Sequence, residues 1–368
     1  MKLPPELAAA LKDLAARAAR RGQRAAAVGG CVRDAKLGRA TRDLDVMAEG
    51  DAAALASECA AAWGAQVETF GRFGTARLTL PGGARLDLAS ARAETYPAPG
   101  ALPVVRPATL EDDLARRDFT VNAMARLVAG DGLGAELDPF GGAKDLAARR
   151  LKVLHPKSFH DDPTRLFRAA RYGGRMGLKP DAATARLIRQ AVARKDPGLL
   201  SRERVRQELW RILEEGDPRP ALRLCALWKI SAAFHPRFKA PSGLAKAKEP
   251  LTRLGLCAFA LGKDAEGFVR SLPLAREDGA ALVAALKVDR AKAVPNQALP
   301  AAAVAVLRAA RPRLPKAALG PRRVTGADLV RAGMMPGPRF TALLEEAASL
   351  QWSGRLRPEA FLRRASRR

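Results

Sequence analysis

The segment RAAAVGGCVRDAKLGRATRDLDV (residues 24–46) carries the pattern that decides the fold. A short apolar run ends at Gly29 and Gly30, and a stretch with helical spacing follows it. The segment predicts a strand, a tight turn and a helix, and then a second strand that begins at the two acidic residues. Leucines alternate with polar or small residues between positions 78 and 88, which is typical of further strands. We therefore expect residues 1–138 to be an α/β unit with a small sheet.

Asp43 and Asp45 lie at positions i and i+2 of the second predicted strand. Side chains at this spacing share one face of a strand, about 6 to 7 Å apart along the chain. Two hard anionic ligands on one face are what a pair of Mg²⁺ ions requires in a phosphoryl-transfer site. The pattern D-x-D also occurs in ordinary surface strands, so by itself it leaves both interpretations open.

The glycine pair before the helix is a second candidate for phosphate chemistry. Backbone N–H groups at such a turn, and at the start of the helix that follows, can face phosphate oxygens. Arg33 follows one turn later and could reach the same triphosphate. A glycine pair also serves simply as a tight turn. The glycine turn, Arg33 and D-x-D within about 17 residues together favour nucleotide chemistry.

The rest of the chain differs in composition and charge. From Asp145 onward Ala, Leu and Arg recur at helical spacing, interrupted by prolines, so we expect this part to be helical. Residues 1–138 hold 18 Lys and Arg against 18 Asp and Glu, whereas residues 139–368 hold 46 against 20 and carry the whole net charge of +26. An excess of this size favours binding to a nucleic acid through its phosphates; the alternative is a solvated basic surface.

Composition excludes several classes of protein. The chain of 368 residues is 48% hydrophobic, which is too apolar for a disordered tail and long enough for two or three domains. Four scattered cysteines without a C-x-x-C pair, and three histidines, indicate a reduced cytoplasmic chain without structural zinc. No apolar run has the length of a signal peptide core or a membrane span, so we expect no membrane partner.

Taken together, these motifs closely resemble the signature of the class II tRNA nucleotidyltransferases. That family comprises the CCA-adding enzymes of bacteria and eukaryotes, their CC-adding and A-adding relatives, and bacterial poly(A) polymerase. The motifs that carry the resemblance are VGGCVRD (28–34), RDLD (42–45), RRDFTVNAMA (116–125), DPFGG (138–142) and DDPTR (161–165). Weaker likeness continues to a tail pattern around Gly326 and PGP (336–338), so the resemblance covers nearly the whole chain.

The resemblance implies a role for each matching residue. Asp43 and Asp45 would be the catalytic residues and would hold two Mg²⁺ ions, with Asp87 on a neighbouring strand as a candidate third carboxylate. Asp162 and Arg165 would act as a protein template that reads the base of the incoming nucleotide. The full set of implied nucleotide-binding residues is Gly29, Gly30, Arg33, Arg117, Asp118, Asn122, Asp162, Arg165, Arg168 and Arg171.

The resemblance also implies an α+β fold and a division of labour along the chain. Residues 1–138 would be a nucleotidyltransferase head with a small mixed β-sheet, 139–215 a helical neck that recognises the base, and 216–368 a helical body and tail that bind tRNA. ATP and CTP would be the other partners, and no DNA is expected.

The implied reaction adds CMP, AMP or both to the 3′ end of tRNA and releases pyrophosphate. Residues 94–107 occupy the place of the family's flexible loop, which takes part in the switch from C to A addition. Their sequence is closer to the A-adding and poly(A) polymerase branch. An A-adding enzyme, a poly(A) polymerase and a catalytically silent RNA-binding protein therefore remain alternatives.

Overall fold

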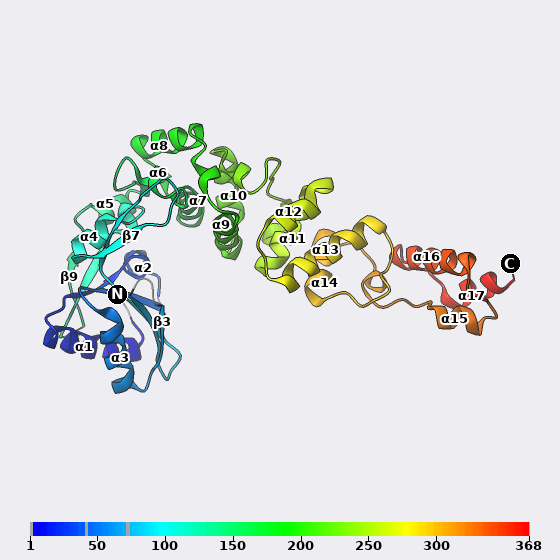
Figure 1. Cartoon of the computed structure of the whole chain (residues 1–368), viewed down its shortest axis with the longest axis horizontal. Helices are drawn as coiled ribbons and strands as arrows, with labels where there is room; N and C mark the ends of the chain where they lie inside the picture. The colour runs from blue at the N-terminus through cyan, green and yellow to red at the C-terminus, as the bar shows by residue number, and fades with distance from the viewer. Residues whose placement is uncertain (1–2, 41–42, 71–73, 131, 368) are drawn as a thin grey trace. The chain divides into compact units, whose positions relative to one another are not determined.

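The computed structural model describes residues 3–40, 43–70, 74–130 and 132–367, which form two compact units, Met1–Leu200 and Ser201–Arg368. Figure 1 shows the strands confined to the first unit and helices filling the second. Arg42 of the RDLD motif lies outside the described residues. The finer division into a head, a neck, and a body with tail stays a prediction.

A mixed sheet of seven strands forms the centre of the first unit. Its order is β3-β4-β5-β2-β1-β8-β9, and every neighbouring pair is antiparallel except β2 and β5, which are parallel. The strands are β1 (Ala25–Val28), β2 (Asp43–Ala48), β3 (Gln66–Phe70), β4 (Thr75–Thr79), β5 (Arg85–Ser90), β8 (Ala125–Ala129) and β9 (Gly132–Leu137). The small mixed sheet expected from the sequence is thereby confirmed.

The central strands bury the residues that the pattern predicts. All four residues of β1 are buried, because it lies between two neighbours and has protein on both faces. In β2, Leu44 and Val46 are buried while Asp43 and Asp45 are exposed, which is the period of a strand with one solvated face. Helices α1 (Pro5–Arg20) and α3 (Ala52–Trp63) pack together against the sheet. Strand β1 then leads directly into α2 (Gly30–Lys36).

The remaining elements in the described part of the first unit are helices and two small two-stranded sheets. The helices are α4 (Leu110–Ala115), η1 (Thr120–Asn122), α5 (Gly142–Ala147), α6 (Ser158–Asp161), α7 (Thr164–Met176), α8 (Ala182–Ala193) and η2 (Asp196–Leu199). Strands β6 (Arg92–Thr95) and β7 (Val104–Pro107) form an antiparallel hairpin. The all-helical expectation for residues after 145 misses one detail, the two-residue parallel pair β10 (Arg150–Leu151) and β11 (Lys179–Pro180). Lys179 precedes a proline, which disfavours helical backbone there.

The second unit contains only helices in its described residues. They are α9 (Arg202–Glu214), α10 (Arg219–Leu227), η3 (Ile230–Ala233), η4 (Ser242–Ala245), α11 (Pro250–Ala260), η5 (Gly262–Asp264), α12 (Ala265–Ser271), α13 (Arg276–Ala291), α14 (Ala301–Ala310), η6 (Lys316–Leu319), α15 (Gly326–Arg331), α16 (Pro338–Trp352) and α17 (Pro358–Ser366). The buried guanidinium of Arg253 on α11 donates to the carbonyls of Leu213 and Glu215 at the end of α9. It therefore satisfies acceptors that the end of a helix leaves open.

Two further observations bear on the class of protein. None of the helices in the described part of the chain combines the length and the apolar character that crossing a bilayer requires. All four cysteines are buried and unbridged. Burial raises the pKa of Cys31 to about 11 and that of Cys257 to about 12.

We predict that Gly142→Ala destabilises the first unit. A Cβ at Gly142 would lie 2.1 Å from the carbonyl oxygen of Thr120, and a backbone atom cannot move aside cheaply. Overpacking of this kind costs about 2 to 3 kcal/mol. Urea unfolding should show this loss. Gly198→Ala is the matched control, because a Cβ there would meet nothing within 4 Å; equal stability of the two variants would contradict the prediction.

Candidate active site

The two acidic residues of β2 form the first part of the site. Asp43 and Asp45 are both exposed on the same side of β2, and Asp45 is the register partner of Asp87 on β5. Asp87 does not stand alone: its two carboxylate oxygens accept hydrogen bonds of 2.8 Å from Nε and Nη2 of Arg77 on β4. The arrangement brings three carboxylates to one region of the sheet. It leaves the third held by a guanidinium, so a metal-binding role of Asp87 stays a prediction.

The donor set fits a divalent metal that completes its coordination with substrate. Within the described residues, no group of three or more His, Cys, Asp and Glu side chains is placed to hold a metal by itself. Mg²⁺ commonly binds one or two carboxylates together with substrate phosphates, so Asp43 and Asp45 suffice on the protein side. Asp45 borders solvent, but the protein atoms packed around its carboxyl group partly desolvate it and, with the negative charge of Asp87, raise its pKa. A cation beside Asp45 would relieve this unfavourable charge.

The glycine turn lies at the end of the neighbouring strand β1. Gly29 adopts φ 74° and ψ −123°, a conformation that side chains rarely allow, and its N–H donates to the carbonyl of Met124. A Cβ at Gly29 would lie 3.0 Å from Nη1 of Arg117. Gly30 has more room, since a Cβ there would make an ordinary contact with Arg33 at 3.6 Å. The turn therefore needs glycine at position 29 and places Arg117 directly against it.

A chain of hydrogen bonds connects α2, the helix after this turn, to α7. Nη1 of Arg33 donates to Oδ1 of Asn122 at 2.5 Å, and Nδ2 of Asn122 donates to Oδ1 of Asp118 at 2.9 Å. The other oxygen of Asp118 accepts from Nε of Arg168 on α7 at 2.7 Å. Four of the predicted nucleotide-binding residues are thus joined in one network.

The charges in this network are stable at neutral pH. Burial raises the pKa of Asp118, but the charge of Arg168 and the hydrogen bonds from Asn122 and Arg168 outweigh this effect. The pKa therefore lies below the ordinary value, and the carboxyl group stays ionised. Burial lowers the pKa of Arg33, and the hydrogen bond and charge of Asp34 more than restore it. Asp118 and Asn122 are each only 5% exposed. Their contacts are those of residues that position arginines.

The proposed base-reading pair lies where α6 meets α7. Oδ1 of Asp162 accepts from the N–H and the hydroxyl of Thr164, the first residue of α7. Arg165 is 4% exposed, and its guanidinium donates to the Ser158 hydroxyl at 2.8 Å and to the Arg116 carbonyl at 2.7 Å. Both side chains are therefore fixed by neighbours. Their part in reading a base stays a prediction.

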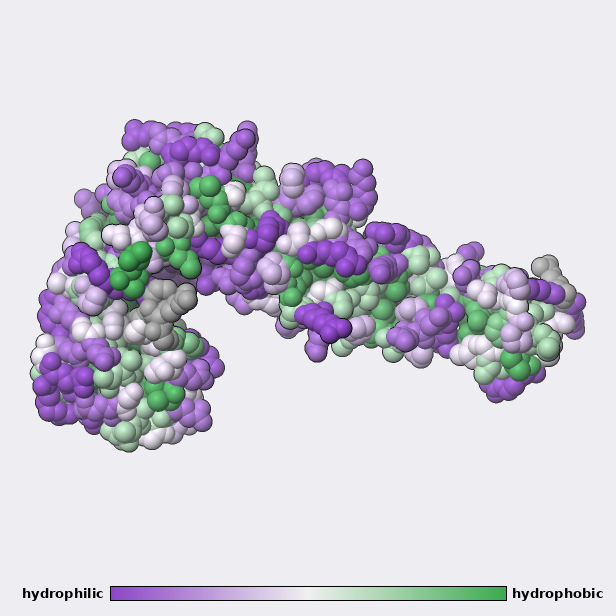
Figure 2. All heavy atoms as spheres, viewed as in Figure 1, coloured by the Kyte–Doolittle hydropathy of each residue, from purple (hydrophilic) through white to green (hydrophobic). Residues whose placement is uncertain are grey.

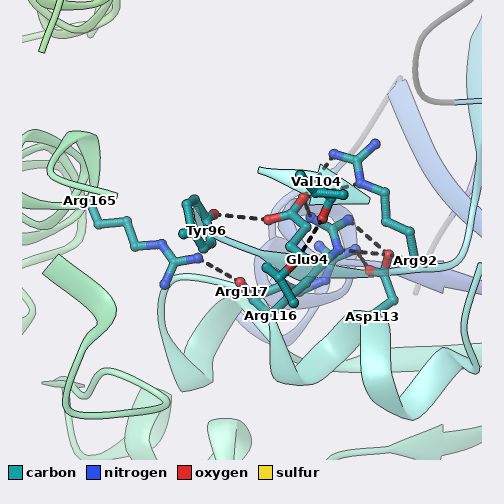
Figure 3. A network of polar contacts seen from close by, with 9 residues as sticks. Arg92, Glu94, Tyr96, Val104, Asp113, Arg116, Arg117 and Arg165 are labelled. Carbon is teal, nitrogen blue, oxygen red and sulfur yellow. Dashed lines mark hydrogen bonds and ion pairs between the residues drawn. The ribbon is translucent and has the colours of Figure 1, made fainter. Parts of the chain in front are cut away.

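The hairpin β6–β7 is tied to this region by a polar network. Glu94 accepts from Nη1 of Arg116 at 2.7 Å and from the hydroxyl of Tyr96 at 3.0 Å, and Asp113 accepts from Arg116 and Arg117 (Figure 3). Figure 3 also shows Arg165 reaching the Arg116 carbonyl from the other side. The tip of the hairpin is anchored as well, since the N–H of Gly100 donates to the carbonyl of Asp161. In this structure the segment equivalent to the flexible loop is a bonded hairpin.

Sequence reasoning missed several residues of this network. Asp113 and Arg116 were not among the predicted site residues, and the pairing of the predicted Arg117 with Asp113 was missed as well. The i, i+3 and i, i+4 spacing of these residues is that of ion pairs on a helix, so the pairing could have been predicted from the sequence. Arg77 and Tyr96 gave no such signal, because their partners depend on strand register and on the path of the hairpin.

Comparison with known proteins agrees with this geometry. Residues 25–152 match the family model described as the poly A polymerase head domain. A CC-adding tRNA nucleotidyltransferase from Deinococcus radiodurans is 34% identical over 361 residues, which cover 97% of this chain and 92% of that protein. An A-adding tRNA nucleotidyltransferase from Aquifex aeolicus is 49% identical over 169 residues, which are 46% of this chain but only 20% of that protein's length.

A solved structure is also similar. It is a tRNA nucleotidyltransferase complexed with a primer tRNA and an incoming ATP analogue, with 29% identity and a TM-score of 0.64, and the match covers 80% of this chain and 94% of that one. The mixed sheet, with paired aspartates beside a glycine turn and arginines on the helices that follow, defines the class of nucleotidyltransferases. The chain belongs to the class II tRNA nucleotidyltransferase and poly(A) polymerase family. The family generally uses a divalent metal ion.

We predict that Asp113→Asn destabilises the protein in a pH-dependent way. Burial raises the pKa of Asp113, but the charges of Arg117 and Arg116 outweigh it, so the folded-state pKa lies below the ordinary value of 3.8. The ionised carboxylate therefore contributes stability above that value, and the contribution is lost as the pH falls through the folded-state pKa. Urea unfolding should show a loss of about 2 to 4 kcal/mol at pH 7.

The difference between Asp113→Asn and the wild type should shrink below about pH 4. Asp217→Asn is a suitable control, because Asp217 pairs with Arg219 on the exposed surface, where ion pairs contribute little. A loss of stability that is the same at pH 7 and pH 3.5 would contradict the assignment to the charged pair.

Proposed function

We propose that the protein adds CMP, AMP or both from CTP and ATP to the 3′ end of tRNA, without a nucleic-acid template, and releases pyrophosphate. The observation that carries the proposal is the placement of Asp43 and Asp45 on β2, next to the strand that leads into the Gly29–Gly30 turn. This arrangement puts carboxylates for a metal beside a turn suited to phosphates. The names of the relatives support tRNA as the acceptor.

The reaction transfers a nucleotidyl group to a hydroxyl. The 3′-hydroxyl oxygen of the RNA forms a bond to the α-phosphorus of the nucleotide, the bond to the bridging oxygen breaks, and pyrophosphate leaves with that oxygen. Mg²⁺ is the metal we propose for Asp43 and Asp45; when bound, it would lower the pKa of the attacking hydroxyl and neutralise charge on the leaving group. The chain's own residues would contribute by orientation: Arg117 beside the glycine turn and Arg168 on α7 would contact the phosphates.

Asp162 and Arg165 are the residues we propose to select the base. A carboxylate can accept from the exocyclic amine of adenine or cytosine, and a guanidinium can donate to a ring nitrogen or carbonyl. Uracil and guanine present the opposite pattern, which would leave a buried charge unpaired. The bonds from Arg165 to Ser158 and to the Arg116 carbonyl support this role, since they fix the direction of the guanidinium.

The helical part is proposed to hold the RNA. It carries the whole excess of positive charge, and Figure 2 shows hydrophilic residues over much of its visible face. A-form RNA offers side chains little sequence information, so we expect contacts to the phosphates and to the shape of the acceptor stem. We propose a cytoplasmic location, as is usual for enzymes that process tRNA.

The decisive experiment offers labelled ATP or CTP, with Mg²⁺, to three tRNA transcripts that lack CCA, carry one C, or end in CC. Entry of CTP into the two shorter transcripts followed by a single A indicates a complete CCA enzyme. Entry of A only after CC indicates an A-adding enzyme, and entry of C alone a CC-adding one. Long A runs on unrelated RNA indicate a poly(A) polymerase. Tight RNA binding without incorporation would leave the silent RNA-binding protein as the answer.

We predict that Asp45→Asn lowers the incorporation rate by about 1,000-fold or more, because it removes a metal-binding charge at the reacting phosphate. Asp51→Asn is the matched control. Asp51 caps α3 through a hydrogen bond from the N–H of Ala54, and asparagine caps a helix equally well. Equal activity of Asp45→Asn and the wild type would refute the catalytic assignment.

We predict that Arg165→Lys relaxes the choice of base. Lysine keeps the charge but lacks the planar set of donors of a guanidinium. It could not bond Ser158 and the Arg116 carbonyl and at the same time present further donors to a base. The ratio of kcat/KM for the preferred nucleotide to that for UTP should fall about 10-fold or more. Lys157→Arg on the turn before α6 provides a control for a change of cation type, and it should keep the wild-type ratio.

A further inference from the structure

Tyr172 on α7 is the centre of a cluster of arginines. Its ring is 6% exposed and meets Phe119 edge-on, with 6.0 Å between ring centroids. Four guanidinium carbons lie over this ring, at 5.3 Å for Arg33, 5.5 Å for Arg168, 4.8 Å for Arg171 and 5.4 Å for Arg175. Contacts of this kind occur about once per 70 to 80 residues in proteins, so four at one ring are a strong concentration.

Two of the four arginines come from separate parts of the nucleotide site. Arg33 lies on α2, directly after the glycine turn, whereas Arg168 lies on the neck helix α7. The chain Arg33–Asn122–Asp118–Arg168 already joins them through hydrogen bonds. The ring of Tyr172 connects the same two guanidiniums a second time, through cation–π contacts.

The physical role of the ring follows from the charges around it. Arg33 is buried, and Arg168, Arg171 and Arg175 are half-buried. Guanidiniums gathered at one place repel one another, and this repulsion grows where water is excluded. The face of an aromatic ring carries negative potential and attracts cations most strongly when they are desolvated. Because Phe119 packs edge-on against the ring, Tyr172 is held in place and cannot simply turn away. The ring can therefore keep the arginines in position before an anion arrives.

We propose that Tyr172 is a positioning residue for nucleotide binding: its ring holds Arg33 of the phosphate turn and Arg168 of the neck in the arrangement that receives the triphosphate. The inference rests on the proposed function, because it takes a nucleoside triphosphate as the ligand of these arginines. The phenol hydroxyl contributes little, since its one hydrogen bond from Arg171 is 3.5 Å long. The aromatic ring itself is the essential part.

The test varies the negative potential on the face of the ring while keeping the shape of the ring nearly constant. Tyr172→Phe should keep the KM for ATP within about 2-fold of the wild type. Phenylalanine carrying one, two and three ring fluorines at position 172 should raise KM and the Kd of ATP stepwise, to roughly 10-fold in total, because fluorine weakens the negative face. Tyr172→Leu should reach the same level. The kcat should change much less than KM, since Tyr172 touches no reacting atom.

The control is Phe159→Leu. Phe159 is buried and packs against the same Phe119, with ring centroids 6.4 Å apart, and no arginine of the described chain lies over its ring. It should lose a similar amount of thermal stability to Tyr172→Leu while keeping the wild-type Kd of ATP. This pair separates loss of packing from loss of the cation contacts.

Each outcome decides the matter. A rise in Kd with each fluorine, at constant melting temperature, supports the proposal. A flat series, or an equal rise of Kd in Phe159→Leu, overturns it and leaves Tyr172 as a packing residue. Titration with ATP needs no catalysis, so a wild type that binds ATP but incorporates nothing refutes the proposed reaction while the fluorine series still tests Tyr172. If the wild type binds CTP but no ATP, the fluorine series is titrated with CTP instead; a wild type that binds neither nucleotide overturns both.

Discussion

The buried carboxylate of Asp118 is the anion on which the arrangement of the site depends. Its two oxygens bind Asn122 and Arg168, and through Asn122 it fixes Arg33. Burying an unpaired charge costs folding free energy, so removal of any one member of this hydrogen-bonded set should destabilise the others. The carboxylate therefore sets where α2 and α7 stand relative to each other within the first unit. This connection positions the glycine turn, the arginines of α7 and the ring of Tyr172.

A second constraint comes from backbone geometry. The left-handed backbone of Gly29 and its close approach to Arg117 leave no room for a side chain. Strand β1 can thus end abruptly and turn into α2 beside the carboxylates of β2. Asp113 accepts hydrogen bonds from Arg117 and Arg116. The backbone carbonyl of Arg116 in turn accepts a hydrogen bond from Arg165. Two carboxylates therefore orient the arginines of the site: Asp118 bonds Arg168, and Asp113 bonds Arg116 and Arg117.

Much of this could be predicted from the sequence, because the decisive patterns are local. The alternation at Asp43 and Asp45 and the glycine pair predicted strand, turn and helix, and the structure confirms them. Contacts that depend on register could not be predicted: Asp87 opposes Asp45, yet Arg77 holds it because β4 runs beside β5. The resemblance places a flexible loop at residues 94–107, and nothing local reveals that Glu94 meets Arg116 and that this segment belongs to a hairpin. Contacts with residues distant in the sequence hold the segment in this conformation.

The buried cysteines have a practical consequence. Thiols react as thiolates, and burial keeps the pKa of Cys31 and Cys257 several units above neutrality. Cys59 and Cys225 are buried with raised pKa values as well. The native chain should therefore be nearly inert to maleimide dyes under native conditions. A single cysteine placed at the exposed Leu102 near the tip of the β6–β7 hairpin would be labelled selectively. Fluorescence could thus report on the surroundings of that hairpin without first removing any natural cysteine.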